Sequence, residues 1–245
     1  MKFKEALKRV RVDKDEGIFG TLVYRKISRL ITASLANTKI GPIPINISSF
    51  VIGLIAALFF AFGEYRFLII GGILTFLSYL LDNVDGETAR LKNMVTSKGG
   101  FLDASFDRTI EGVLILGICF GIYSQTANPI IGLYGIIALI GIYMSEMIPM
   151  MANRYFEKGT LAKEHSKLFL AGIFEKLRIK KSFLTLGVDF RFSIIAIGAV
   201  LNQLIIVLWF FMIIQNLYWI MILLTIAFRK EQITIKNKKK ADNKR

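Results

Sequence analysis

Long uncharged apolar runs are the feature that most constrains how this chain of 245 residues can fold. Hydrophobic residues make up 54% of the sequence and are gathered into these runs, whereas a soluble domain spreads its charges throughout. Runs of roughly 20 apolar residues are long enough to cross a bilayer as helices. We therefore expect an all-α integral membrane protein with a single membrane domain.

The runs predict six membrane-spanning helices. Their approximate bounds are 46–62, 67–81, 101–123, 129–151, 190–201 and 204–228. The second run continues in helical pattern to residue 90, so we expect its last turns to emerge into water. The spans define a membrane domain at 46–228, between an N-terminal segment at 1–45 and a lysine-rich tail at 229–245 that we expect to be disordered.

The N-terminal segment contains an amphipathic pattern over residues 18–38. The apolar members fall on one broad side of a helix and are Ile18, Leu22, Ile27, Leu30, Ile31 and Leu35. Arg25, Lys26 and Arg29 lie opposite. This pattern is typical of a helix that lies in the membrane interface, and a helix that binds a partner protein is the alternative.

The basic residues are divided unequally between the two sides of the membrane. With six spans both termini share one side, and the loops at 63–66, 124–128 and 202–203 face the other. Of the 32 lysine and arginine residues, only Arg66 falls in those loops. The positive-inside rule then places the termini and the basic segment at 152–188 in the cytoplasm. The same asymmetry explains the net charge of +14 without a nucleic-acid partner, and it favours anionic lipids and anionic substrates.

Four aspartates lie at the end of the second span and the beginning of the third, namely Asp82, Asp85, Asp103 and Asp107. Spacings of three and four residues put each pair on one face of a helix. Two carboxylates 4 Å apart repel by about 4 kcal/mol at an effective dielectric near 20, so either some are protonated or cations lie among them. The chain has one histidine and one cysteine, so the ligands would be oxygen atoms. Such ligands favour a hard ion, Mg²⁺ or Mn²⁺, singly or as a pair, and a phosphate-bearing substrate.

Two other interpretations of the acids remain open. They could form a solvated cluster at the helix ends, paired with Arg90, Lys98 and Arg108. A divalent-cation transporter or sensor could also use them. Transport would require polar residues to continue to the other side of the membrane, and the outer halves of the second and third spans, at 67–73 and 117–123, offer almost none.

The residues between the acids complete a longer pattern. It reads Asp82-x-x-Asp85-Gly86-x-x-Ala89-Arg90, eight residues, Gly99, three residues, Asp103, three residues, Asp107. This pattern resembles the signature of the CDP-alcohol phosphotransferase family at every position. The resemblance implies an enzyme that moves a phospho-alcohol group from a CDP-alcohol to an acceptor hydroxyl and releases CMP.

The resemblance also implies residue roles. Asp82, Asp85 and Asp103 would ligate two Mg²⁺ or Mn²⁺ ions, and Asp107 would ligate a metal or act as the general base. The residues implied to bind the cytidine diphosphate are Gly86, Ala89, Arg90 and Gly99. The donor is either a CDP-activated lipid, which would yield a phospholipid, or water-soluble CDP-inositol, which would yield an inositol-phosphate solute. Related enzymes are dimers, so the resemblance implies a homodimer.

Two segments extend the resemblance, and one departs from it. The stretches EGIFGTLVYRKISRLITASLANT and GVDFRF resemble the branch that contains archaeal di-myo-inositol-phosphate-phosphate synthases. Family members often carry a Pro-Asn-x-x-Thr-like segment before the first span. Here Pro44 is followed by Ile45, and Ser48 stands where threonine is common, which leaves Asn46 as the candidate substitute for the usual asparagine.

Several polar residues near the cytoplasmic ends of the later spans are candidates for binding the acceptor. They are Arg108, Arg154, Arg191, Glu111 and Glu146. The arginines could hold an anionic acceptor such as a sugar phosphate or an inositol phosphate, or they could extend to the phosphates of membrane lipids. The glutamates could line the acceptor cavity, or they could be protonated and hydrogen-bonded to a neighbouring helix.

Three further residues in or next to the spans have structural interpretations. We expect Asp189 to pair with Arg191 or to cap the fifth span. Gly117 and Gly121 form a small-xxx-small spacing that favours close helix packing, within the chain or between subunits.

Overall fold

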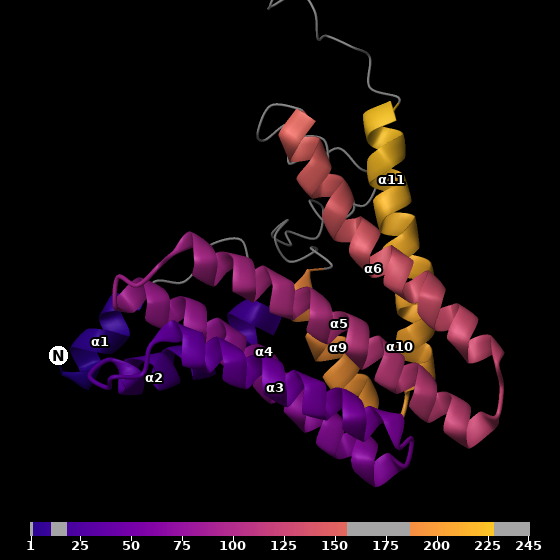
Figure 1. The fold of residues 1–245 in the computed structure, drawn as a ribbon, viewed down its shortest axis with the longest axis horizontal. Coiled ribbons are helices and arrows are strands. Elements are labelled where there is room, and N and C mark those ends of the chain that lie inside the picture. Colours follow the sequence, from indigo (N-terminus) through magenta and orange to yellow (C-terminus); the bar gives the residue numbers. More distant parts are fainter. Residues whose placement is uncertain (1, 11–18, 156–186, 228–245) are drawn as a thin grey trace, which may run out of the picture.

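The structure is a computed structural model that describes residues 2–10, 19–155 and 187–227. Within these residues every regular element is helical, as expected (Figure 1). The tail at 229–245 and most of the basic segment at 152–188 lie outside the described residues.

The described part of the chain contains the following helices. In chain order they are α1 (Phe3–Arg9), η1 (Gly20–Tyr24), α2 (Arg25–Leu35), α3 (Pro42–Ala61), α4 (Tyr65–Leu91), α5 (Ser97–Thr126), α6 (Ile130–Tyr155), α9 (Val188–Val200), α10 (Leu204–Phe210), η3 (Phe211–Gln215) and α11 (Asn216–Ala227). The elements η1 and η3 are π-helical turns, and η3 joins α10 to α11 in one continuous helix.

Four of the described helical segments are long and apolar enough to cross a membrane, whereas the sequence predicted six spans. They are Pro42–Ala61, Tyr65–Leu91, Ile130–Ala152 and Leu204–Ala227. The other two predicted spans correspond to α5 and α9. Helix α5 has 30 residues, but its first half carries charged side chains from Lys98 to Glu111. Helix α9 has 13 residues, or about 20 Å of helix, which is shorter than a bilayer core of about 30 Å.

Local sequence signals set the helix ends that frame the acids. Gly41 precedes α3 and Pro42 occupies its first turn, where a missing N–H costs nothing. Thr96 caps α5 because its Oγ1 accepts a hydrogen bond from the Gly99 N–H at 3.0 Å. Both caps lie at the end of the bundle where α4 ends, so the signature residues of α4 and α5 lie next to the start of α3.

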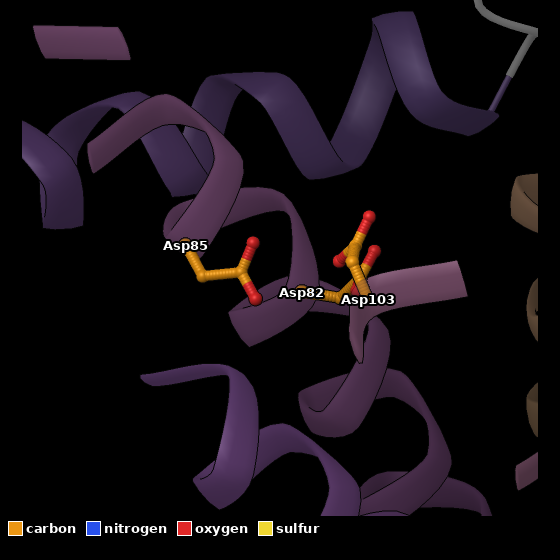
Figure 2. Close-up of side chains that lie close together, drawn as sticks. All are labelled: Asp82, Asp85 and Asp103. Atoms are coloured by element: carbon orange, nitrogen blue, oxygen red, sulfur yellow. The ribbon is translucent and has the colours of Figure 1, made fainter. Parts of the chain in front are cut away.

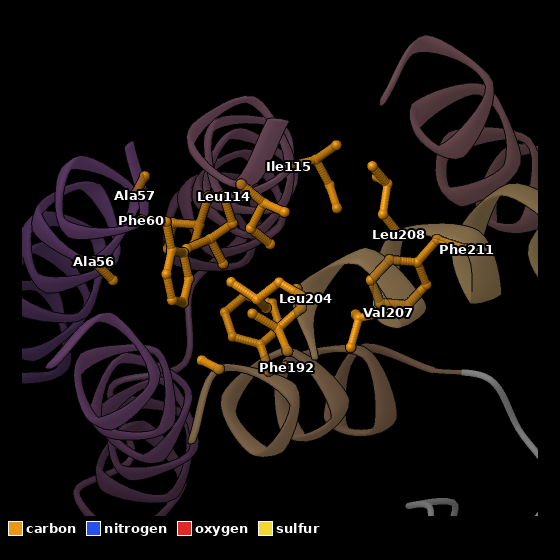
Figure 3. Close-up of a cluster of buried hydrophobic side chains, with 14 of the residues drawn as sticks. Ala56, Ala57, Phe60, Leu114, Ile115, Phe192, Leu204, Val207, Leu208 and Phe211 are labelled. Atoms are coloured by element: carbon orange, nitrogen blue, oxygen red, sulfur yellow. The ribbon is translucent and has the colours of Figure 1, made fainter. Parts of the chain in front are cut away.

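Helix α3 packs along both α4 and α5, and α9 packs on α4. The core between them is apolar and includes Phe60 of α3, Leu114 of α5, Phe192 of α9 and Leu208 of α10 (Figure 3). Each of these four side chains is at most 1% exposed. The core fixes how α4 and α5 lie against α3, and thereby fixes where their acids meet.

The small-xxx-small pair of α5 serves packing within the chain. A Cβ atom at Gly117 would collide with the backbone of Ala57, and one at Gly121 would collide with the backbone of Phe60. Both partners belong to α3. The close approach that the spacing predicts is therefore made between α3 and α5 of the same subunit.

The predicted N-terminal amphipathic helix corresponds to η1 and α2. Its apolar side chains Leu22, Ile27 and Leu30 are exposed. The prediction was incomplete for Arg25, which is 8% exposed and faces α4 instead of water. At the other end of the chain, α6 and α11 pack on each other and lean away from α3, α4 and α5 (Figure 1).

Candidate active site

Three of the four signature aspartates meet at one point. Asp82 and Asp85 come from the last turns of α4, and Asp103 comes from the second turn of α5. One ligand oxygen from each lies within 4.8 Å of the other two, and the side chains converge (Figure 2). Asp107 lies one turn farther along α5, on the same face as Asp103 and half-buried. In the described part of the chain, the oxygens that lie within 4.8 Å of one another come from Asp82, Asp85 and Asp103, and Asp107 does not belong to this three-acid group.

The donor set of this group fits a hard divalent cation. Around one Mg²⁺ ion, oxygen ligands at about 2.1 Å are separated by at most about 4.2 Å. Three oxygens spread over no more than 4.8 Å therefore need only small side-chain rotations to share one ion, or can be divided between two. The site also needs positive charge, because carboxylates that lie this close repel one another. Burial strengthens this repulsion, and Asp85 is only 5% exposed.

Asn46, the candidate substitute for the asparagine of the family segment, contacts two of the acids. Its Nδ2 atom donates to Asp85 Oδ2 at 2.5 Å and to Asp103 Oδ1 at 3.1 Å. The residue comes from the first turns of α3, so one amide joins three helices. Ile45, the residue that follows Pro44, is buried at 7% exposure. The amide that contacts the acids is therefore that of Asn46.

A cavity of about 630 Å³ opens beside the acids, within the usual size range of small-ligand sites. Its lining includes all four residues that the family resemblance assigned to CDP, namely Gly86, Ala89, Arg90 and Gly99. The remaining walls come from the start of α3, the α4–α5 connection and the acids Asp85 and Asp103.

Gly86 and Gly99, the two glycines of the signature, leave space in this cavity that no other side chain fills. A Cβ atom at Gly86 would meet only the guanidinium of Arg90, at 3.6 Å, which is ordinary contact. A Cβ atom at Gly99 would meet Thr96 Oγ1 at 3.2 Å. Neither backbone position has a positive φ. Protein packing therefore does not explain Gly86, and at Gly99 only Thr96 Oγ1 would have to give way by a small distance, whereas a ligand lying close to the helix backbone would explain both glycines.

Four of the five predicted acceptor-binding residues form a closed ring of ion pairs. Arg191 Nε contacts Glu111 Oε1 and Arg191 Nη2 contacts Glu146 Oε1, each at 2.6 Å. Arg108 completes the ring through Glu111 Oε2 at 2.5 Å and Glu146 Oε2 at 3.2 Å. The ring joins α5, α6 and α9 next to Asp107. Arg154, two turns beyond Glu146 on α6, is exposed and belongs to none of these pairs.

This ring differs from two of the arrangements considered for these residues from sequence, namely protonated glutamates and arginines that extend to lipid phosphates. The glutamates form ion pairs with arginines instead of being protonated and hydrogen-bonded to a neighbouring helix, and Arg191 is 1% exposed instead of reaching lipid phosphates. The side chains of Arg108 and Glu146 are 32% and 34% exposed, so the ring has one accessible edge. Asp189 Oδ2 accepts a hydrogen bond from the backbone N–H of Gly20 at 3.2 Å and ties α9 to η1.

Sequence reasoning overlooked Glu87, which lies inside the signature between Gly86 and Ala89. Its side chain is 0% exposed and accepts bonds from three side chains of α2. A signal was available in the helical period. Glu87 falls about 200° around the helix from Asp85, and a charged residue on the far face of a packed helix must have a buried partner.

The comparisons with known proteins agree with this site. The family model described as CDP-alcohol phosphatidyltransferase matches residues 42–183, which include the whole signature. The chain belongs to this family. The family model extends from the start of α3 through the acids and through three members of the ion-pair ring, Arg108, Glu111 and Glu146.

Two curated relatives belong to the inositol-phosphate branch that the sequence suggested. A bifunctional IPC transferase and DIPP synthase of Archaeoglobus fulgidus is 30% identical over 140 residues, 57% of this chain and 26% of that protein. An archaetidylinositol phosphate synthase of Pyrococcus horikoshii is 34% identical over 91 residues, 37% of this chain and 47% of that protein. The chain thus spans less than half the length of these relatives.

A solved structure gives a more distant likeness. The phosphatidylinositol phosphate synthase of Mycobacterium tuberculosis with CDP-DAG bound matches 74% of this chain and 94% of that chain, with a TM-score of 0.46 and 21% identity.

Proposed function

We propose that this protein transfers a phospho-alcohol group from a CDP-alcohol to the hydroxyl of an acceptor alcohol and releases CMP. One observation carries the proposal: three carboxylates converge beside a 630 Å³ cavity, whose lining includes two of them and the four signature residues assigned to CDP. Membership of the family supports the same reaction. It also favours a transferase over the divalent-cation transporter that the acids alone would allow.

The four aspartates have the central role in this proposal. Asp82, Asp85 and Asp103, joined by Asp107, would hold two Mg²⁺ or Mn²⁺ ions. Ions bound there would neutralise the donor's diphosphate and stabilise the departing CMP. Asn46 holds Asp85 and Asp103 in position from α3. The backbone at Gly86, Ala89 and Gly99 admits the nucleotide closely, and Arg90 offers a planar set of donors for its phosphates.

Asp107 has a second role as the general base. A hydroxyl is a weak nucleophile until a base takes its proton. Asp107 lies between the three-acid group and the ion-pair ring, which begins at the next residue, Arg108. We therefore place the acceptor alcohol on this side, against the accessible edge formed by Arg108 and Glu146. Arg154 extends the positive charge toward the cytoplasm.

The membrane arrangement belongs to the same proposal. We propose six spans within a membrane domain at 46–228, with α5 and α9 completing the four that meet the length and composition criteria. The termini and the aspartates face the cytoplasm, where nucleotide donors are found, and α2 lies in the interface with its apolar side toward lipid. A homodimer is proposed from the family resemblance alone.

A product screen tests the function directly. Purified protein would receive Mg²⁺ or Mn²⁺, either CDP-inositol or a CDP-activated lipid, and a panel of acceptor alcohols, while CMP release is measured. We expect release with one donor class, loss of release with a chelator, and loss in Asp103→Asn and Asp107→Asn. Near-normal turnover in either variant would contradict the mechanism. Uptake of divalent cations into liposomes that contain the protein, without release of CMP, would favour the transporter instead.

A further inference from the structure

The back of the catalytic helix α4 is held by a buried polar cluster that is separate from the acids and the cavity. Glu87 Oε1 accepts from Arg25 Nη1 at 2.8 Å and from Ser28 Oγ at 2.8 Å. Glu87 Oε2 accepts from Thr32 Oγ1 at 2.8 Å. Ser28, Thr32 and Glu87 are 0% exposed, and Arg25 is 8% exposed.

The three donors come from one face of α2. Their spacings of three and four residues place them in a row along that helix. On α4, Glu87 projects away from the cavity, since Asp85 lies about 200° away around the helix axis. Helix α2 therefore contacts Glu87 on the side of α4 away from Asp85, and the lining of the cavity includes none of these four residues.

We propose that Glu87 is a positioning residue, which sets the rotation of the last turns of α4 and thereby the placement of Asp85, Gly86 and Arg90 for metal and nucleotide. This inference rests on the proposed function for its nucleotide part. A rotation of α4 that moved Asp85 would also withdraw Glu87 from its partners and leave a buried charge unpaired. Apolar contacts would allow such rotation more readily, because hydrophobic packing has no direction.

A second contact links the same N-terminal region to the mouth of the cavity. Lys92 Nζ, just after α4, donates to the carbonyl oxygens of Thr38 at 2.9 Å and Ile40 at 2.7 Å. The next residues, Gly41 to Pro44, form one rim of the cavity. Helix α4 is thus tied to α2 at Glu87 and to the rim at Lys92, so the N-terminal region fixes both the rotation of α4 and the position of the opposing wall.

The test compares Glu87→Gln with Thr32→Val. The first keeps the shape of Glu87 but removes the charge that Arg25 neutralises. The second removes one hydrogen bond and nearly preserves side-chain volume, so it remains informative if Glu87→Gln does not fold. Asn216→Ala is the matched control, because Asn216 Nδ2 links α11 to α6 by a bond to Ile137 O at 2.9 Å, remote from the signature. Folding would be followed by gel filtration and thermal unfolding in detergent.

Two readouts separate positioning from general stability. Mn²⁺ affinity would be measured by electron paramagnetic resonance, and the KM for the donor by CMP release. Loss of a residue that orients metal ligands typically weakens affinity about 10–100-fold. We expect about tenfold weaker Mn²⁺ binding and a higher donor KM in Glu87→Gln, a smaller shift in Thr32→Val, and no shift in Asn216→Ala.

The outcomes also distinguish this inference from the proposed function. If the unaltered protein releases no CMP from any donor, the proposed function fails, and Mn²⁺ affinity still decides the role of Glu87. Folded Glu87→Gln and Thr32→Val with unchanged Mn²⁺ affinity would overturn the inference. So would an equal weakening in Asn216→Ala, because the effect would then follow stability and not the placement of α4.

Discussion

Asn46 on α3 donates its amide N–H to Asp85 on α4 at 2.5 Å, although the two residues are 39 positions apart in the chain. The same amide reaches Asp103 on α5 at 3.1 Å. The start of the first long apolar helix therefore holds the two segments of the signature together.

Replacing Asn46 by alanine should weaken metal binding and CMP release by about 10–100-fold, because Asp85 and Asp103 lose the donor that orients them. The measurement is Mn²⁺ affinity together with the rate of CMP release. Ser48→Ala is the control on the same helix, since Ser48 is exposed and bonds only to the Pro44 carbonyl in the described structure. Equal effects in the two variants would contradict this role for Asn46.

Gly86→Ala should separate stability from activity. The new methyl group would lie 3.6 Å from the Arg90 guanidinium, so the protein accommodates it, and alanine is a better helix former by about 1 kcal/mol. We expect an unchanged or higher melting temperature together with a raised KM for the donor, because the methyl group enters the nucleotide cavity. Gly132→Ala on α6, where nothing lies within 4 Å, should change neither kinetic constant.

Helical periodicity predicted which aspartates share a helix face, because the two members of each pair lie close together in the sequence. Three and four residues are fixed intervals on a helix, so Asp82 with Asp85 and Asp103 with Asp107 could be assigned to common faces before any packing was known. The positions of Gly86, Ala89, Arg90 and Gly99 in one cavity followed from the family pattern. Local spacing and resemblance thus predicted the signature part of the lining, whereas the walls from the start of α3 and from the α4–α5 connection were not predicted.

Pairing between distant helices could not be predicted in the same way. Arg191 lies 80 residues from Glu111, and their contact depends on how α9 packs between α4 and α10. The choice of α3 as the partner of Gly117 likewise depends on tertiary packing. Glu87 is a partial exception. Its position around α4 required a buried partner, but nothing in the neighbouring sequence showed that the partner would come from α2.

Arg191→Met should destabilise the protein by about 3–5 kcal/mol, since removing one member of a buried ion pair leaves its partners with uncompensated charge. Glu111 is 2% exposed, so water cannot replace the lost guanidinium. Thermal unfolding in detergent would show a lower melting temperature. Arg66→Ala is the matched comparison, because the Arg66–Glu64 pair at 2.7 Å is exposed and such pairs contribute about 0–1 kcal/mol. Similar losses in both variants would show that the ring contributes no more than a surface pair.

Gly117→Leu should prevent the close packing of α5 against α3. A Cβ atom at this position already collides with the backbone of Ala57, and backbone in the middle of α3 cannot move aside as a flexible side chain can. Forcing the helices apart would cost several kcal/mol and would also displace Asp103 from Asp85, because both acids are held against the start of α3. We expect a strongly lowered melting temperature and loss of Mn²⁺ binding. Gly132→Leu places the same side chain on an exposed face of α6 and should leave both quantities unchanged, whereas a stable Gly117→Leu protein with intact Mn²⁺ affinity would contradict the α3–α5 contact.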